Sequence, residues 1–314
     1  MRILFLSGCA PAKYNYREPN AYPFYLIKEI ATRHETAVLY YNSNDKINIA
    51  DIDAGLKDVG VKWQKQVRTN RLMILFFSLR YIPKAILLKL GIRFNLKIPQ
   101  AIVPLQLSVY KKYPDSNFVR DVKEFSPDLV IVFPMQLYFA VRKITRLNIP
   151  VEVLCTDSTV LHYTRQLKVV NRIPTSETIT KQMLEQSKKL EAAYKTIPAN
   201  YLFVGEEDKN SFIENSGQTS GSFFIPHHLY SGVGNKHEWI NGNGKVNVLI
   251  GGDGHTIYAG DEADVIAQEI AWSKKPDPEK INFHFLGTRY DKAIDSLQKA
   301  GYTVISKACG SWYK

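Results

Sequence analysis

The chain has 314 residues and a formal net charge of +11, from 41 Lys or Arg against 30 Asp or Glu. With 45% hydrophobic residues it can bury two ordinary cores, and its opening residues, MRILFLSG, form too short an apolar run for a signal peptide. Its three cysteines, Cys9, Cys155 and Cys309, are odd in number and far apart. This spacing argues against a disulfide framework and a metal site, and favours a reducing cytosol.

The net charge comes from one stretch of the sequence, residues 59–114. This stretch holds eleven basic residues and no Asp or Glu, so the other 258 residues carry 30 basic and 30 acidic side chains. A local excess of positive charge predicts an anionic partner. The basic residues are Lys62, Lys65, Arg68, Arg71, Arg80, Lys84, Lys89, Arg93, Lys97, Lys111 and Lys112.

Residues 71–94 (RLMILFFSLRYIPKAILLKLGIRF) indicate the kind of partner. Apolar side chains interrupted by Arg or Lys are typical of a helix on a membrane surface, whereas nucleic acid favours polar or stacking neighbours. Pro83 and the lack of an 18-residue uncharged run argue against a membrane span. The basic residues do not share one helical face, so a buried helical hairpin with charges at its rim is the alternative. The membrane interpretation assigns anionic lipid to Arg71, Arg80, Lys84, Lys89 and Arg93.

The chain opens with a βαβ pattern, because residues 2–41 read as strand, loop, helix and strand. A parallel sheet collects its ligands at the carboxyl ends of its strands, which places the loop 8–20 at the predicted site. This loop makes Gly8 and Asn20 candidate ligand-binding residues. The G-x-G-x-x-G fingerprint is absent, so a nicotinamide cofactor gets little support.

The alternation of strands and helices resumes after the basic stretch and predicts one doubly wound α/β domain over residues 1–230. Gln136 begins the helix after one buried strand, and Asp157 directly follows the next. The predicted helices are 117–125, 136–147, 176–195 and 206–215, and the predicted strands are 128–133, 151–155, 201–204 and 222–225.

A Gly- and Asn-rich linker, 231–245, then separates a second region, residues 246–314. We expect strands at 246–250, 281–286 and 302–305, helices at 262–272 and 290–300, and a Gly-rich turn at 251–254. These elements make only half of a second α/β domain. The second lobe is therefore predicted to be truncated or small, with a hinge and a cleft between the two lobes.

Three segments together resemble family 4 of the GT-B glycosyltransferases. They are RILFLSG with IATRHETAVLY, SPDLVIVF with NIPVEVLCTDS, and LEAAYKTIPANYLFVGEEDKNSFIEN with FFIPHHL. The resemblance covers residues 1–230, and after Gly251 only the strand-then-glycine outline remains. It implies transfer of a sugar from a nucleotide-sugar to an acceptor held by the first domain, without a metal or other cofactor. Gly8, Asn20 and Gln136 would then bind the acceptor.

The sequence departs from this family at several positions. Pro19-Asn20-Ala21 replaces a Gly-Gly pair, and Phe133-Pro134 and Thr156-Asp157 stand where a His is common. His227-His228 replaces Asn-Gly, and the E-x7-E segment that holds the donor sugar is not in the chain. The donor-binding candidates are His227, His228, Gly251, Gly252, Gly254 and Arg289, with Lys307 as a further substitute for the family's phosphate-binding side chains.

Asp157 is the candidate general base, and His162 lies five residues after it. The alternative is that Asp157 caps a turn with Thr156 and Ser158 and that His162 is structural. The glycines at 251–254 would let a phosphate approach backbone N–H groups, or would simply form a turn. Hydrogen bonding in the hinge is the alternative for His227 and His228.

The predicted function is a cytoplasmic glycosyltransferase, peripheral on the inner face of the membrane. Its partners would be a nucleotide-sugar, a lipid-linked or cell-envelope glycan and an anionic membrane surface, but not nucleic acid. Two alternatives stay open: a non-catalytic glycan- or membrane-binding partner of another transferase, and a sugar-nucleotide epimerase. The missing Glu pair favours the first alternative, and the basic apolar stretch argues against the second.

Overall fold

A computed structural model describes residues 1–12, 21–41, 48–94, 112–169, 174–219, 221–224, 245–253, 277–288 and 290–307. The chain divides into two compact units, and each is described by itself. The first comprises residues 1–167 and 171–229, and the second comprises residues 230–314 together with 168–170.

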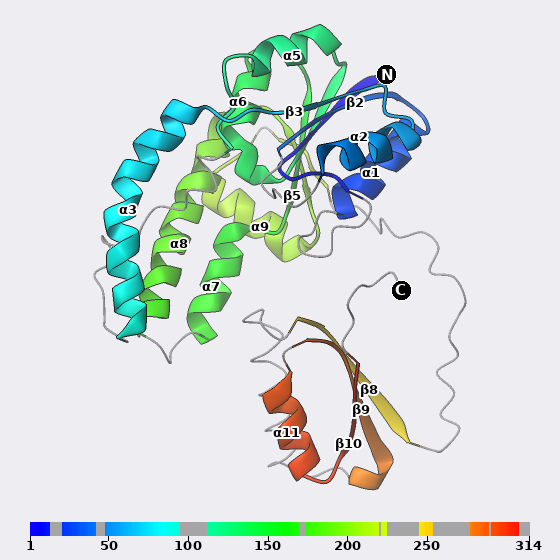
Figure 1. Ribbon diagram of the computed structural model, residues 1–314, viewed down its shortest axis with the longest axis vertical. Helices are drawn as coiled ribbons and strands as arrows, with labels where there is room; N and C mark the ends of the chain where they lie inside the picture. The colour runs from blue at the N-terminus through cyan, green and yellow to red at the C-terminus, as the bar shows by residue number, and fades with distance from the viewer. Residues whose placement is uncertain are drawn as a thin grey trace. The chain divides into compact units, whose positions relative to one another are not determined.

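The first unit is built on a parallel sheet of seven strands in the order β3-β2-β1-β4-β5-β6-β7 (Figure 1). The chain begins in the middle of this sheet and winds outward in both directions, which confirms the predicted doubly wound α/β fold. The strands are β1 (Arg2–Ser7), β2 (Glu35–Tyr40), β3 (Trp63–Gln66), β4 (Leu129–Phe133), β5 (Val151–Thr156), β6 (Asn200–Phe203) and β7 (Phe223–Phe224). The helices are α1 (Ala21–Ala31), α2 (Ile49–Asp58), α3 (Arg71–Arg93), α5 (Phe118–Phe125), α6 (Tyr138–Thr145), α7 (Thr159–Val169), α8 (Pro174–Ala193) and α9 (Glu206–Ser216), with short 3-10 turns η2 (Met135–Leu137) and η3 (Tyr194–Thr196).

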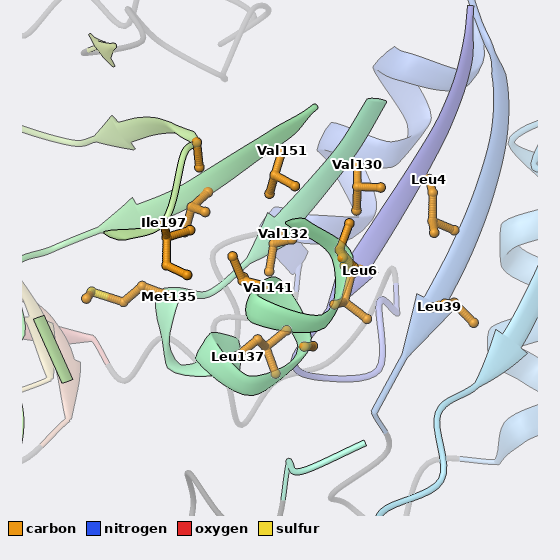
Figure 2. Close-up of a cluster of buried hydrophobic side chains, with 14 of the residues drawn as sticks. Leu4, Leu6, Leu39, Val130, Val132, Met135, Leu137, Val141, Val151 and Ile197 are labelled. Atoms are coloured by element: carbon orange, nitrogen blue, oxygen red, sulfur yellow. The ribbon is translucent and has the colours of Figure 1, made fainter. Parts of the chain in front are cut away.

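Two hydrophobic layers cover the two faces of this sheet. Along β1, Leu4 and Leu6 belong to the layer that contains α5 and α6, while Ile3 and Phe5 belong to the layer that contains α1 and α2. Figure 2 shows part of the first layer, where Leu6 and Val132 lie near Val141 of α6 and Leu4 lies farther along the sheet. Strands that are buried on both faces read as continuous apolar runs, which is why the sequence predicted them well.

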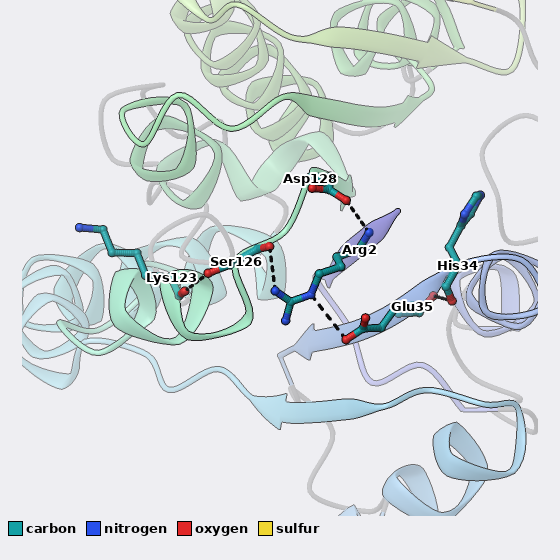
Figure 3. Close-up of polar contacts among 7 residues, drawn as sticks. Arg2, His34, Glu35, Lys123, Ser126 and Asp128 are labelled. Carbon is teal, nitrogen blue, oxygen red and sulfur yellow. Dashed lines mark hydrogen bonds and ion pairs between the residues drawn. The ribbon is translucent and has the colours of Figure 1, made fainter.

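The amino edge of the sheet is held by polar contacts around Arg2 (Figure 3). The backbone N–H of Arg2 donates to Asp128 Oδ2 at 2.7 Å, and its guanidinium donates to the Ser126 carbonyl at 3.4 Å. The same guanidinium lies 3.5 Å from Glu35 Oε1 at the start of β2. These contacts tie the beginnings of β1 and β2 to the turn before β4. The opposite, carboxyl edge is the one at which parallel sheets of this kind bind ligands.

The basic stretch 59–114 does not leave the sheet at its first residue. It first forms β3, which pairs with β2 through Ala37–Tyr40, and only then enters α3. The chain returns at an antiparallel bridge between Thr69 and Pro114. This bridge encloses residues 70–113, of which the structure describes 70–94 and 112–113.

Helix α3, cyan in Figure 1, is a single helix of 23 residues at the periphery of the first unit. None of its described side chains is fully buried, and Leu72, Leu79 and Ile86 are 78%, 64% and 55% exposed. The alternative of a buried helical hairpin is therefore wrong for this helix, because a buried helix would hide these side chains. No helix among the described residues is both long enough and apolar enough to cross a bilayer.

The second unit contains a parallel sheet in the order β10-β9-β8 with one described helix packed on it. The elements are β8 (Val246–Asp253), β9 (Ile281–Thr288), α11 (Asp291–Lys299) and β10 (Thr303–Lys307), with a 3-10 turn η4 (Pro278–Lys280). The core includes Phe283, Phe285, Tyr290, Leu297 and Tyr302. The predicted helix 262–272 and the linker residues 231–244 lie outside the described residues.

The predicted Gly-rich turn is wrong for Gly251, Gly252 and Asp253, which continue strand β8. Their backbone pairs in register with β9, and Gly252 stands opposite Gly287. A parallel neighbour of equal length supplies ladder hydrogen bonds that outweigh the local preference of glycine for a turn. Gly254 lies outside the described residues.

Candidate functional site

The first part of the candidate site is where β1 and β4 end. Gly8 is buried, and its backbone N–H donates to the Phe133 carbonyl. A Cβ on Gly8 would lie 2.6 Å from Cδ of Pro134 and 3.1 Å from Nζ of Lys112. Close backbone packing therefore requires glycine here, whether or not a ligand approaches. Asn20, the other candidate in this loop, lies outside the described residues.

We expect Gly8→Ala to destabilise the first unit by about 1–3 kcal/mol, because the new methyl group would overlap the Pro134 ring. Gly55→Ala in α2 is the control, because a Cβ there would lie 3.8 Å from the nearest atom of Phe24. That helical substitution should raise stability by up to about 1 kcal/mol. Urea unfolding of the two variants measures the difference, and equal midpoints would contradict the packing.

Gln136 lies in η2, directly beyond the carboxyl end of β4. Its side chain is half-buried, and its Oε1 atom is buried without a hydrogen-bond partner. A buried carbonyl oxygen without a donor costs roughly 1–3 kcal/mol, which a ligand hydroxyl would recover. This position agrees with the predicted acceptor role of Gln136, which stays a prediction.

The second part of the candidate site is the turn from β5 into α7. Thr156 ends β5 in the left-handed region with φ 58°, Asp157 is exposed, and Ser158 is buried. Ser158 begins α7: its Oγ accepts from the backbone N–H of Leu161 at 3.2 Å. This helix cap is therefore made by Ser158. Asp157 stands beside it with an exposed side chain, and its role as a general base stays a prediction.

Two acids from other helices hold this turn, and the sequence did not predict either of them. Asp208 Oδ1 in α9 accepts from the backbone N–H of Ser158 at 2.9 Å. Glu191 in α8 is fully buried, and its Oε1 accepts from Ser158 Oγ at 2.9 Å and from the N–H of Val160 at 3.0 Å. Thr159 Oγ1 donates to the same oxygen at 3.2 Å. Burial raises the pKa of Glu191, and these hydrogen bonds oppose that rise.

Asp157 and His162 influence each other electrostatically, as their predicted proximity requires. Partial burial and the nearby Asp208 raise the pKa of Asp157, and His162 opposes the rise. Partial burial lowers the pKa of His162, against the opposing effect of Asp157 and Asp208. The two shifts favour the uncharged form of each side chain. Groups with shifted pKa values that lie close together are candidates for proton transfer, and the role of this pair stays a prediction.

The acids at the start of α9 differ in role. Glu206, Glu207 and Asp208 lie in the first turn of α9, which corresponds to the helix predicted over residues 206–215. Glu207 forms an ion pair with Arg165 of α7, so it also joins the two helices that flank the turn. Asp208 is the acid of this group that reaches the site. A sequence pattern of three consecutive acids, E-E-D, does not distinguish among them.

The structure gives no comparable geometry for the donor side. Gly251 and Gly252 lie in β8, and Lys307 is the last residue of β10. His227, His228, Gly254 and Arg289 lie outside the described residues. Within the described part of the chain, no group of three or more His, Cys, Asp or Glu side chains is placed to hold a metal ion.

Comparison with known proteins bears on the fold. No family model matches the sequence, and no curated protein sequence matches it. Among solved structures, the lipopolysaccharide outer core galactosyltransferase WaaB in its apo form is similar with a TM-score of 0.53 at 14% identity. The similarity covers 98% of this chain and 68% of WaaB. The chain has a GT-B glycosyltransferase fold.

Two further GT-B structures are similar at lower scores. The apo structure of OtsA has a TM-score of 0.48 at 9% identity, covering 98% of this chain and 73% of OtsA. MurG of Acinetobacter baumannii has a TM-score of 0.43 at 10% identity, covering 100% of this chain and 67% of MurG. The similarity to WaaB confirms the GT-B fold class predicted from the sequence.

In this GT-B chain, Glu191→Ala is expected to destabilise the first unit by about 3 kcal/mol. The substitution leaves two hydroxyl groups and the N–H of Val160 without their acceptor in a buried place. Glu185→Ala on the same helix is the control, because Glu185 is exposed and pairs only with Lys188 three residues on, among the contacts described. That change should stay within about 0.5 kcal/mol. Similar unfolding midpoints for both variants would contradict the role of Glu191.

Proposed function

We propose that this protein is a glycosyltransferase that docks on an anionic membrane and moves a sugar from a nucleotide-sugar to a lipid-linked or cell-envelope glycan. The docking surface would be α3, on the cytoplasmic side of the membrane. The GT-B fold supports sugar transfer, and the side chains of α3 support the membrane. The observation that carries the proposal is the exposed apolar face of α3.

This face follows the helical repeat. At 3.6 residues per turn, its large exposed side chains fall within an arc of about 140°. Side chains on the other side of the helix, among them Met73, Phe77 and Leu88, are half-buried. The helix is thus apolar on both sides, and only one side is covered. The exposed members are Leu72, Leu75, Phe76, Leu79, Ile82, Ile86, Leu87 and Leu90, and Phe94 lies exposed directly after the helix.

Three basic residues of α3 lie at one border of this exposed face. Arg71 and Lys89 fall at that border by the helical repeat, and Arg93 falls just inside it. Long basic side chains at the rim of an apolar face reach lipid headgroups while the apolar residues enter the acyl boundary. Lys84 falls between Met73 and Phe77 on the other side of the helix and is half-buried like them. The basic residues of α3 therefore do not share one face.

An exposed apolar face of this length is expected to bind a partner, since protein surfaces in water rarely leave such patches uncovered. Anionic lipid fits best, because residues 59–114 contain no Asp or Glu to repel it. Asp157 and His162 would supply the base for the acceptor hydroxyl at the carboxyl edge of the first unit. Donor binding would fall to the second unit, with no cofactor.

The test is release of nucleoside diphosphate from a panel of UDP-, GDP- and ADP-sugars, with and without vesicles made from a bacterial lipid extract. We expect release with one nucleotide-sugar and only when the extract is present, with label appearing in the lipid or glycan fraction. Release without any acceptor transfer, or none with any donor, would contradict the proposal.

A further inference from the structure

The base of the α3 segment lies at the carboxyl edge of the first sheet. The N–H of Val67 donates to the Tyr40 carbonyl at 2.7 Å, just beyond the ends of β2 and β3. The N–H of Asn70 donates to the Tyr113 carbonyl at 3.0 Å, and the N–H of Asp115 donates to the Arg68 carbonyl at 3.1 Å. Helix α3 is therefore anchored at the same edge of the sheet as Gly8 and Gln136, the described candidates for acceptor binding.

Lys112 connects this base to the end of β1. Its Nζ lies 3.1 Å from the point that a Cβ on Gly8 would occupy, and the Phe133 carbonyl lies 3.2 Å from that point. The Lys112 side chain is half-buried. Its ammonium group thus stands at the junction of β1 and β4, and no side chain on Gly8 separates it from the backbone.

Two neighbouring lysines hold the surrounding structure together. Lys65 Nζ lies 2.7 Å from Asp121 Oδ1, and Lys143 Nζ donates to the carbonyls of Pro114 and Asp115 at 3.1 and 3.4 Å. These lysines hold α5 and the base of the segment in place. Lys112 differs from them in its position, because its ammonium group lies beside Gly8 at the end of β1.

We infer that Lys112 binds the phosphate of a phosphate-linked acceptor, such as a glycan carried on a prenyl phosphate or diphosphate. The inference rests on the proposed function, because docking of α3 would bring the base of its segment to the headgroup level. A phosphate there would form charge-assisted hydrogen bonds with the ammonium group. Gln136 Oε1, buried without a partner beyond Pro134, would accept from a hydroxyl of the attached sugar.

Farnesyl diphosphate, a soluble prenyl diphosphate, is the probe, titrated without vesicles and without a sugar donor. We expect Lys112→Gln to weaken its binding about tenfold, the size of one charged hydrogen bond, while Lys112→Arg keeps most of it. Lys62→Gln is the matched control: Lys62 is exposed and its N–H pairs with Thr36 at the start of β2, at the opposite edge. This control should bind like the parent protein.

Inorganic pyrophosphate and vesicles of phosphatidylglycerol distinguish other sources of phosphate. We expect pyrophosphate to bind more weakly than farnesyl diphosphate but to lose affinity in the same variant. Lys112→Gln should affect vesicle binding no more than Lys62→Gln does. A larger loss on vesicles with no change for farnesyl diphosphate would overturn the inference in favour of bulk lipid.

Equal binding of farnesyl diphosphate by the parent, Lys112→Gln and Lys62→Gln proteins would also overturn the inference. Binding in the second unit would give this equal result. The outcome is separate from the proposed function, because the titration requires neither transfer nor docking. If the Lys112→Gln protein transfers sugar with an unchanged acceptor KM, the phosphate subsite at Lys112 is disproved and the proposed transfer activity stands. If Lys112→Gln but not Lys62→Gln weakens farnesyl diphosphate binding and the parent protein transfers no sugar, the phosphate subsite is supported and the proposed transfer activity is disproved.

Discussion

Replacing Arg71, Arg80, Lys84, Lys89 and Arg93 together by Gln is expected to weaken binding to anionic vesicles by between three and four orders of magnitude, about 5 kcal/mol. Each basic residue near such a surface contributes about 1 kcal/mol at physiological salt. Five of them give roughly 5 kcal/mol, and each 1.4 kcal/mol corresponds to a factor of ten in affinity. Co-sedimentation with phosphatidylglycerol vesicles over a range of lipid concentrations measures the loss.

The apolar side chains of α3 should leave a residual affinity that responds differently to salt. Insertion of a large side chain such as Leu79 or Phe76 contributes roughly 1.5–3 kcal/mol, and salt does not screen it. The parent protein should therefore lose affinity as salt rises, whereas the five-Gln variant should be almost insensitive to salt.

A matched control removes the same five charges from exposed positions elsewhere on the first unit. Lys57, Lys62, Lys123, Arg142 and Arg146 are exposed and lie outside α3. Their replacement by Gln should reduce vesicle binding only through the net charge, by far less than the α3 variant. Equal losses in the two variants would show that the net charge, and not the helix, carries the attraction.

Asp157→Asn is expected to lower kcat for sugar transfer by about 10²- to 10⁴-fold, with little change in the acceptor KM. The asparagine keeps the shape of the side chain but cannot take a proton from the acceptor hydroxyl. Asp58→Asn is the control, because Asp58 is exposed at the end of α2, shortly before β3 begins. Equal kcat values for the Asp157→Asn and Asp58→Asn proteins would show that Asp157 does not act in the reaction.

The pH dependence gives the same hypothesis a second readout. Burial and Asp208 raise the pKa of Asp157 above its ordinary value of 3.8. A base must be deprotonated to act, so activity should fall as the pH drops through this raised pKa. The acid limb of the profile should therefore lie above that of an ordinary aspartate. Asp208→Asn should move this limb to lower pH, because it removes a like charge.

Several elements of the fold could be predicted because burial on both faces gives a continuous apolar run. β1, β4 and β5 are examples, and the structure places all three near their predicted bounds. β3 was missed because its residues, WQKQ, belong to a partly exposed edge strand. The helix α7 was missed because its amino terminus is stabilised from a distance, by Glu191 in α8.

The candidate site also contains both residues that the sequence predicted and residues that it missed. The sequence predicted Asp157, His162 and Gln136 from their positions after strands, a rule that needs only local information. It missed Asp208, Glu191 and Lys112, because long-range packing brings these side chains to the turn or the edge. The structure also resolves the ambiguity of α3, whose sequence is apolar on nearly all sides and so hides which side is exposed.

The most direct test of membrane docking compares Phe76→Trp with Phe77→Trp in vesicles that contain brominated lipid. Phe76 is on the exposed face of α3, whereas the adjacent Phe77 is half-buried. Subtracting the signal of the parent protein, whose four native tryptophans give the background, isolates the new side chain. We expect strong quenching for Phe76→Trp and weak quenching for Phe77→Trp. No quenching at position 76, or equal quenching at the two positions, would contradict insertion of the exposed face.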